Sequence, residues 1–245
     1  MRIDKYLFEK GFAESRQKAQ TMISNGNCTV NGKTVNKASF DVCDGDEIKI
    51  VGETLKYVGR GGLKLEKAIS EFGIDPTGKV CADIGASTGG FTDCLLMNGA
   101  LRVYAIDCGS GQLHPKLLSD PRVVNIEKFN AKLLSQKVLG EKVDLAVMDV
   151  SFISQTALHR PVSEVLKVGG AFISLIKPQF EAGKEHIGKG GIVKDSSVYS
   201  QVIEKVSASA LLLGLELIAC SESPIKGGDG NTEFIAYFIK RKEIL

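Results

Sequence analysis

The chain has 245 residues, of which 43% are hydrophobic and 24% charged, with 27 glycines and only 6 prolines. This composition is typical of globular proteins and excludes collagen-like, coiled-coil and wholly disordered chains. The 31 lysines and arginines nearly balance the 29 aspartates and glutamates, so the net charge is only +2 and any nucleic-acid site must be a local basic patch.

The first 58 residues are predicted to form a small α+β domain of two short helices followed by strands. Ile3, Leu7 and Phe8 form the apolar stripe of the first helix, and Ser15 precedes a second helix that ends at Asn25-Gly26. Glycine turns then separate three short strands, predicted over 28–30, 33–35 and 46–51. The predicted domains are 1–58 and 59–245, with the junction lying within 52–62.

Basic side chains gather in the first 40 residues, where seven lysines and arginines face three acidic residues. Arg2, Lys5, Arg16 and Lys18 lie on or beside the two predicted helices. They are candidates for phosphate contacts, which orient a nucleic acid without reading its sequence. The alternative is a solvated charged face, which is common on surface helices.

From residue 79 onward, predicted strands alternate with helices. Short apolar runs predict strands over 80–84, 102–106, 123–126, 143–148 and 171–176. Helices are predicted near 89–98, 155–166 and 196–213. Two further strands, 215–220 and 234–239, follow without an intervening helix, so the last is expected to enter the sheet antiparallel. The pattern predicts a seven-stranded, doubly wound α/β sheet.

A glycine-rich segment, Asp83-Ile-Gly-Ala-Ser-Thr-Gly-Gly-Phe-Thr-Asp93, lies between a predicted strand and a predicted helix. Glycines let the backbone approach a ligand, and the ligand crevice of an open α/β sheet lies at the carboxyl ends of its strands. The dinucleotide fingerprint is absent, because Ser87 replaces its middle glycine. Asp107 ends the next strand, where a carboxylate can accept hydrogen bonds from a ribose diol. We therefore predict an adenosine cofactor site, with a purely structural turn as the alternative.

Five segments spread over nearly the whole chain carry a family resemblance. They are Gly59-Arg-Gly-Gly-Leu-Lys-Leu65, the glycine-rich segment 83–93, Met148-Asp-Val-Ser-Phe-Ile-Ser154, Ile176-Lys-Pro-Gln-Phe-Glu181 and Asn231-Thr-Glu-Phe234. Together with an N-terminal segment that resembles the S4 RNA-binding domain, they resemble the TlyA (haemolysin A) family of FtsJ-like ribosomal RNA 2′-O-methyltransferases. The resemblance implies S-adenosyl-L-methionine as cofactor and the ribose 2′-hydroxyl of cytidine in ribosomal RNA as the methyl acceptor.

By position, the resemblance places the family's catalytic tetrad on Lys64, Asp149, Lys177 and Glu233. Asp149 and Lys177 follow successive predicted strands, where such sheets build their sites. A ribose hydroxyl is a poor nucleophile, so a base must remove its proton, and a lysine acts as a base only when it is neutral. Desolvation and a neighbouring ammonium such as that of Lys64 favour the neutral form, whereas nearby carboxylates oppose it. We therefore expect Lys177 to be the general base, with the other three residues positioning the ribose; no metal is required.

Further site residues are expected from the resemblance and from their positions. The expected cofactor contacts are Asp83, Gly85, Ser87, Gly89, Gly90, Phe91, Asp107 and Glu127. Glu127, after the third strand of the sheet, is equally consistent with a residue that starts a helix. Arg60, and Lys189 within a lysine-bearing loop, are added to the RNA-binding candidates, although a solvated loop is an equal alternative for the second.

The sequence lacks some of the features that other classes of function require. The segment 183–190 nearly spells a nucleotide-binding P-loop, but it lacks the Ser or Thr after its lysine, and the next predicted helix starts late. The three histidines form no spaced cluster, which argues against a zinc site. A membrane-active haemolysin, or an RNA-binding protein without catalysis, remains the alternative to an enzyme.

No uninterrupted apolar stretch approaches the roughly 20 residues that cross a bilayer, and the N-terminus carries no apolar signal core. The six cysteines stand far apart with no C-x-x-C pair, as is typical of reduced, buried thiols. We therefore expect a cytoplasmic protein that has ribosomal RNA or ribosomal subunits, and no membrane, as its partner.

Overall fold

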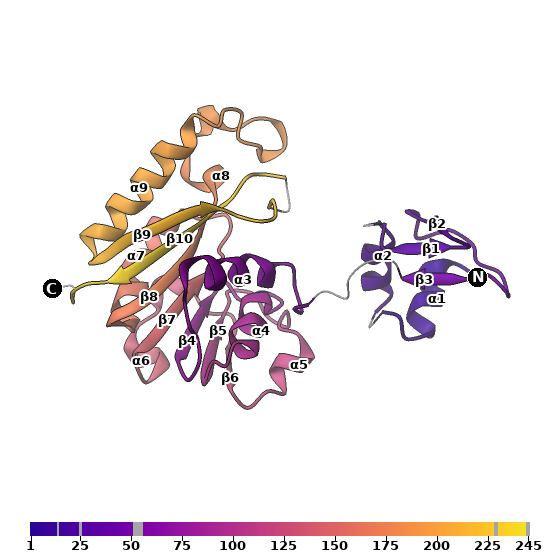
Figure 1. Cartoon of the computed structure of the whole chain (residues 1–245), viewed down its shortest axis with the longest axis horizontal. Helices are drawn as coiled ribbons and strands as arrows, with labels where there is room; N and C mark the ends of the chain where they lie inside the picture. The colour runs from indigo at the N-terminus through magenta and orange to yellow at the C-terminus, as the bar shows by residue number, and fades with distance from the viewer. Residues whose placement is uncertain (14, 25, 51–55, 228–229, 244–245) are drawn as a thin grey trace. The chain divides into compact units, whose positions relative to one another are not determined.

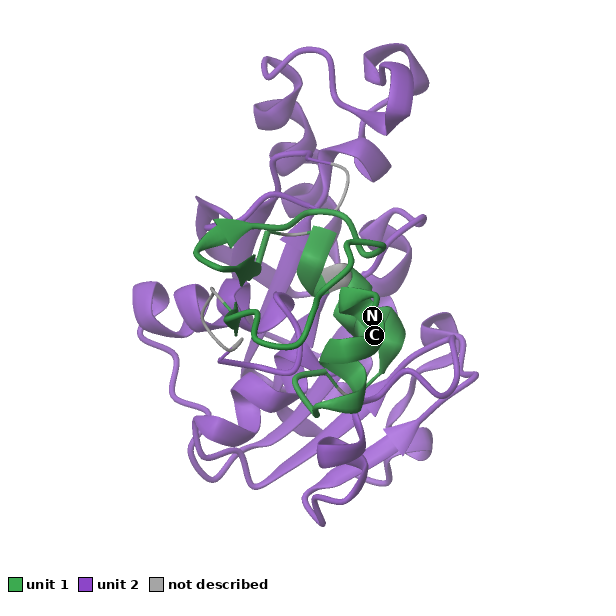
Figure 2. Ribbon diagram, turned by 90° about the vertical axis from the view of Figure 1, so that its right-hand side faces the viewer, with its two compact units in different colours: residues 1–54 green, residues 55–245 purple. Residues whose placement is uncertain are grey.

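A computed structural model describes the chain except for residues 14, 25, 51–55, 228–229 and 244–245. Asn25 and part of the expected junction therefore lie outside the described residues. The chain divides into two compact units, 1–54 and 55–245, coloured separately in Figure 2. This division falls four residues before the boundary expected from the sequence. Tyr57 is 2% exposed within the core of the larger unit, and the Val58 N–H donates to Asp93 Oδ2 at 3.0 Å, which ties both residues to that unit.

The smaller unit packs two helices against a small sheet. Its elements are α1 (Ile3–Glu9), α2 (Arg16–Ser24), β1 (Cys28–Val30), β2 (Lys33–Thr34) and β3 (Ile48–Ile50). The strands run antiparallel in the order β2-β1-β3. Ile3 and Leu7 are fully buried, but Phe8 is 46% exposed, so its expected place on the inward stripe is wrong. At 100° per residue, Phe8 lies about 140° around the helix from Ile3.

The larger unit is built on one seven-stranded sheet, as predicted. Its strands are β4 (Val80–Ile84), β5 (Arg102–Ile106), β6 (Val123–Ile126), β7 (Val143–Met148), β8 (Leu166–Ile176), β9 (Leu215–Glu222) and β10 (Phe234–Lys240). Their order is β6-β5-β4-β7-β8-β10-β9. Strands β4 to β8 pair in parallel, and β10 is antiparallel to both β8 and β9, which confirms the expected direction of the last strand.

Helices cover both faces of this sheet (Figure 1). One face packs against α3 (Gly61–Phe72), α4 (Gly90–Met97) and α5 (Pro115–Leu118). The other packs against α6 (Gln136–Leu139), α7 (His159–Val165) and α9 (Val198–Leu212). The short helix α8 (Pro178–Glu181) follows β8, and single turns lie at Ala131–Leu133, Gln155–Leu158, Lys184–His186 and Lys189–Gly191. Within β4, Cys81 faces the first layer and Ala82 the second, as the two-residue period of a strand requires.

The topology collects the candidate residues at one edge of the sheet. Asp149 directly follows β7 and Lys177 directly follows β8. Glu233 directly precedes β10, and because β10 is antiparallel, its amino end lies at the same edge as the carboxyl ends of its parallel neighbours. Strand β4 lies between β5 and β7, at the point where the strand order reverses, which is where such sheets bind ligands.

Candidate active site

The four residues expected as a tetrad form a continuous chain of alternating charges. Lys64 Nζ donates to Glu233 Oε2 at 2.5 Å and lies 3.9 Å from Asp149 Oδ2. The other oxygen of that carboxylate, Asp149 Oδ1, lies 2.6 Å from Lys177 Nζ. Residues that are far apart in the sequence, from α3 and from three loops at the strand ends, are therefore brought within ion-pair distance.

Burial makes this arrangement unusual for lysine. Lys64 is 7% exposed, Lys177 8% and Glu233 2%. A buried charge is costly unless it is paired, and here two ammonium groups are matched by two carboxylates. Lys177 Nζ also donates to Ser151 Oγ at 2.9 Å. Ser151 was missed as a site residue, although it stands two positions after Asp149 in a segment that the resemblance already covers.

Asp83, the acid that begins the glycine-rich segment, is fully buried at the end of β4. Its Oδ2 accepts a hydrogen bond from Thr92 Oγ1 at 2.6 Å, whereas Oδ1 has no hydrogen-bond partner among the described residues. Burial raises the pKa of Asp83 to about 7; the Thr92 hydrogen bond opposes the shift, and the nearby carboxylate of Asp149 adds to it. The end of β4 thus holds a buried carboxyl group with one oxygen that has no partner in the described part of the chain.

Two carboxylates that were expected to contact the cofactor accept hydrogen bonds from backbone N–H groups of loops. Asp107 Oδ2 accepts from the Ser87 N–H at 2.8 Å, and its Oδ1 accepts from the Gly109 N–H at 2.7 Å. The carboxylate thereby joins the glycine-rich loop to the end of β5. Glu127 Oε1 accepts from the Gly111 N–H at 2.9 Å.

Two cavities of about 230 and 400 Å³ adjoin the tetrad and share Gly85, Ser87, Asp149 and Ser151. The smaller is also lined by Gly59, Arg60, Gly61, Ala86, Thr88, Gly90, Phe91 and Lys177. The larger is also lined by Ile106, Asp107, Cys108, Gln112, Phe129, Asn130, Ala131, Val150, Phe152, Ile153 and Leu158. Of the expected cofactor contacts, Asp83, Gly89 and Glu127 do not line either cavity.

The linings suit a ligand with one flat apolar end and one cationic end. The larger cavity combines apolar side chains with the Asp107 carboxylate, which fits a nucleoside. The Asp149 carboxylate, which lines both cavities, supplies negative charge beside the glycine-rich loop. Phe129 and Leu158 were not expected as lining residues. Phe129 lies in a loop, where an isolated apolar residue carries no periodic signal, and Leu158 falls in a predicted helix, where an apolar side chain indicates core packing.

Gly85 lies close to the backbone of Asp149, which leaves no room for a side chain. Its φ is +85°, and an added Cβ would lie 2.5 Å from the Asp149 carbonyl oxygen. We expect Gly85→Ala to lower the free energy of unfolding by about 1–3 kcal/mol and to weaken cofactor binding, because both strain and displacement of Asp149 follow. Thermal denaturation and calorimetric cofactor titration test this. Gly140→Ala is the matched control: its φ is +80° with nothing within 4 Å, so it should show backbone strain but normal cofactor binding.

The RNA-binding candidates lie on both units. Arg2 and Arg16 both contact the carboxylate of Asp4, and Lys5 Nζ lies 3.6 Å from Glu9 Oε1. Lys18 is an exposed residue of α2. In the larger unit, Arg60 is exposed at the start of α3 and lines the smaller cavity, and Lys189 is exposed in the loop before α9.

Comparison with protein families identifies the larger unit: the model described as FtsJ-like methyltransferase matches residues 57–240. The chain belongs to the FtsJ-like methyltransferase family. A second model, the S4 domain, matches residues 1–48 of this FtsJ-like methyltransferase. Both matches confirm the resemblance seen in the sequence and show that the chain is an enzyme of the methyltransferase class.

Relatives of this FtsJ-like methyltransferase match it over nearly its full length. Hemolysin A of Brachyspira hyodysenteriae is 44% identical over 98% of this chain and 100% of its own. The 16S/23S rRNA (cytidine-2′-O)-methyltransferase TlyA of Mycobacterium tuberculosis is 38% identical over 96% of this chain and 88% of its own. A solved structure from Streptococcus thermophilus, provisionally assigned as a hemolysin, is 41% identical and superposes with a TM-score of 0.80 over 99% of this chain and 89% of its own.

Within the described part of the chain, no helix is both long and apolar enough to span a membrane. The described residues also contain no group of three or more histidine, cysteine, aspartate or glutamate side chains arranged to hold a metal ion.

Proposed function

We propose that this enzyme transfers a methyl group from S-adenosyl-L-methionine to the ribose 2′-hydroxyl of cytidine in ribosomal RNA. The observation that carries the proposal is the buried chain Glu233–Lys64–Asp149–Lys177, which lies beside two adjoining cavities sized for a nucleoside-bearing cofactor. The name of the Mycobacterium tuberculosis relative describes the same reaction.

The chemistry requires one proton transfer and one alignment. The cofactor supplies an electrophilic methyl group on a sulfonium sulfur. Lys177 would accept the proton of the 2′-hydroxyl at Nζ, so that the ribose oxygen can take the methyl group that the bound cofactor would supply, with the sulfur keeping the electron pair of the bond it loses. General-base catalysis of this kind contributes about 10²–10⁴-fold.

The remaining tetrad residues keep Lys177 and the ribose in place. Asp149 contacts both lysines and so fixes their separation. Glu233 holds Lys64 from the opposite side. Of the two lysines, Lys177 lines the smaller cavity and so faces the reacting centre, which favours it over Lys64 as the base.

The cofactor would be held by residues at the ends of β4 and β5. Asp107 is placed to accept hydrogen bonds from the ribose diol, and the apolar lining of the larger cavity suits adenine. The close approach of Gly85 to Asp149 brings the cofactor loop beside the tetrad. The S4 domain holds the RNA by contacts to the sugar–phosphate backbone of the RNA, while the target nucleotide is splayed out toward the tetrad.

The deciding experiment incubates the purified protein with isotope-labelled S-adenosyl-L-methionine and unmodified 30S or 50S ribosomal subunits, followed by nucleoside mass spectrometry of each RNA. We expect labelled 2′-O-methylcytidine in one or both RNAs. A label on a base, or no label with cofactor binding intact, contradicts the proposed acceptor. Liposome dye release in the same preparation tests the haemolysin alternative, for which we expect no signal.

A further inference from the structure

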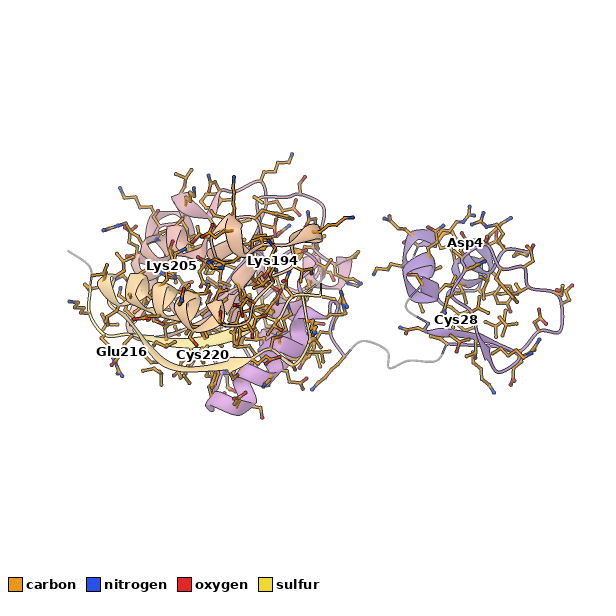
Figure 3. The ribbon with its side chains drawn as sticks, turned by 90° about the horizontal axis from the view of Figure 1, so that it is seen from above. Asp4, Cys28, Lys194, Lys205, Glu216 and Cys220 are labelled. Carbon is orange, nitrogen blue, oxygen red and sulfur yellow. The ribbon has the colours of Figure 1, made fainter. Side chains whose placement is uncertain are left out.

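A buried carboxylate in the S4 domain organises two of the basic residues that were expected to bind RNA. Asp4 is fully buried, at the start of α1. It lies among the helices of its unit, whereas Cys28 belongs to the sheet (Figure 3). Sequence analysis assigned Asp4 no role, because nothing in the sequence shows which side chains would surround it.

Both oxygens of Asp4 are fully used by donors. Arg2 reaches the carboxylate through Nε and Nη2, each at 3.1 Å. Arg16 Nε donates to Oδ2 at 3.0 Å, and Gln20 Nε2 donates to the same oxygen at 2.8 Å. The Lys5 N–H donates to Oδ1 at 2.9 Å. Burial alone would raise the pKa of Asp4, but the hydrogen bonds from Gln20, Arg16 and Arg2 hold it well below its ordinary value.

The two arginines face solvent as well as Asp4. Their side chains are 47% and 48% exposed, although the carboxylate between them is completely covered. Two guanidinium groups on one carboxylate leave a net charge of +1. A second anion that approaches from solvent would balance that charge, and the planar, multi-donor guanidinium is well matched to phosphate.

We propose that Asp4 is a positioning residue for RNA, because it holds Arg2 and Arg16 side by side as a clamp for one backbone phosphate of ribosomal RNA. Here "clamp" means these three residues. The inference rests on the proposed function. Net charge alone would predict that an acidic residue such as Asp4 weakens the binding of a polyanion, whereas this buried carboxylate would strengthen it.

If Asp4 positions the clamp, its loss should change RNA affinity in the direction opposite to that expected from charge alone. Removal of a negative charge near a polyanion should tighten binding and steepen its salt dependence if charge alone matters. If Asp4 positions the clamp, Asp4→Asn should instead weaken binding to ribosomal RNA by about tenfold and lower the slope of log Kd against log salt by about 1, the value of one phosphate contact. The KM for RNA should rise, while kcat at saturating RNA stays unchanged.

The experiment uses the full-length protein, with filter binding to its ribosomal RNA substrate at several salt concentrations, alongside thermal denaturation and cofactor titration. Asp46→Asn is the matched control. Asp46 is an acceptor in the same unit, bonded to the Cys43 N–H and the Asn31 side chain, but outside the clamp. It should alter stability without weakening RNA binding or lowering the salt slope.

Equal or tighter binding by Asp4→Asn, or weaker binding at an unchanged slope, overturns the inference. If that variant does not fold, Arg16→Lys provides the test, since it keeps the net charge but loses the fork that grips Asp4. We expect it to bind RNA several-fold more weakly, and wild-type affinity would overturn the inference. Failure of the wild-type protein to bind or methylate ribosomal RNA would instead refute the proposed function.

Discussion

Lys177→Met should reduce kcat for methyl transfer by about 10²–10⁴-fold, the range that a general base contributes. Methionine approximates the length of the lysine side chain but cannot accept a proton. Cofactor affinity should be retained, because an ammonium beside the smaller cavity does not attract a cationic ligand. Single-turnover methylation with saturating RNA measures the rate of methyl transfer, and calorimetric titration of cofactor into the free protein measures cofactor affinity.

The control for this variant is Lys67→Met. Lys67 lies one turn after Lys64 on α3, and its Nζ donates to the carbonyl oxygen of Glu222, outside the tetrad. Its loss should leave kcat unchanged. Activity of Lys177→Met near the wild-type level would refute the assignment of the base and direct attention to Lys64, the other lysine of the tetrad.

Asp83→Asn should remove a pH dependence of stability that the wild-type protein shows. The folded-state pKa of Asp83 is raised from 3.8 to about 7, so the folded protein favours its neutral form. The contribution of Asp83 to the free energy of unfolding is therefore fully present below pH 4 and is lost as pH rises toward 7. The total loss is roughly 4 kcal/mol at 1.36 kcal/mol per pKa unit. Asparagine does not ionise, so its variant should lose this slope between pH 5 and 8.

Denaturant unfolding at half-unit pH steps tests the prediction. Asp144→Asn is a control of opposite sign. Burial alone would raise the pKa of Asp144, but Lys167, the Val80 N–H and the charge of Lys79 together lower it, so its contribution to stability is lost as pH falls. A wild-type stability that does not decline between pH 5 and 8 relative to Asp83→Asn would show that Asp83 is not held neutral.

The sheet was largely predictable because its buried strands are short apolar runs. Four of the predicted ranges, 80–84, 102–106, 123–126 and 143–148, match strand bounds residue for residue. Strand β8 begins at Leu166, five residues before the predicted start, because Lys167 and two glycines interrupt the apolar run. The predicted helix near 196–213 is α9, which starts at Val198.

Helix α3 was missed, although it carries Lys64. Its first two residues are glycines, which indicate a linker rather than a helix. The structure shows why one of them is needed: a Cβ on Gly62 would lie 2.3 Å from the Tyr57 ring. Local propensity thus gave way to packing that only the folded unit reveals.

The membership of the tetrad came from the family resemblance, and its contacts came only from the fold. Lys64 and Glu233 are 169 positions apart, a separation that no periodic signal spans. The sequence marks Arg2 and Arg16 as candidates for phosphate contacts, which stays a prediction. Their shared partner Asp4 could not be inferred, since a buried acid and an exposed one look alike in sequence.

The insertion of β10 between β8 and β9 also orders events during synthesis. A chain is made from its amino end, so α9 and β9 leave the ribosome while the place beside β8 is still vacant. The strand that fills this place follows β9 in the chain, and the residue just before it is Glu233. We therefore expect the nascent polypeptide to complete its sheet and the candidate site in the same step, so that chains truncated before β10 would lack activity.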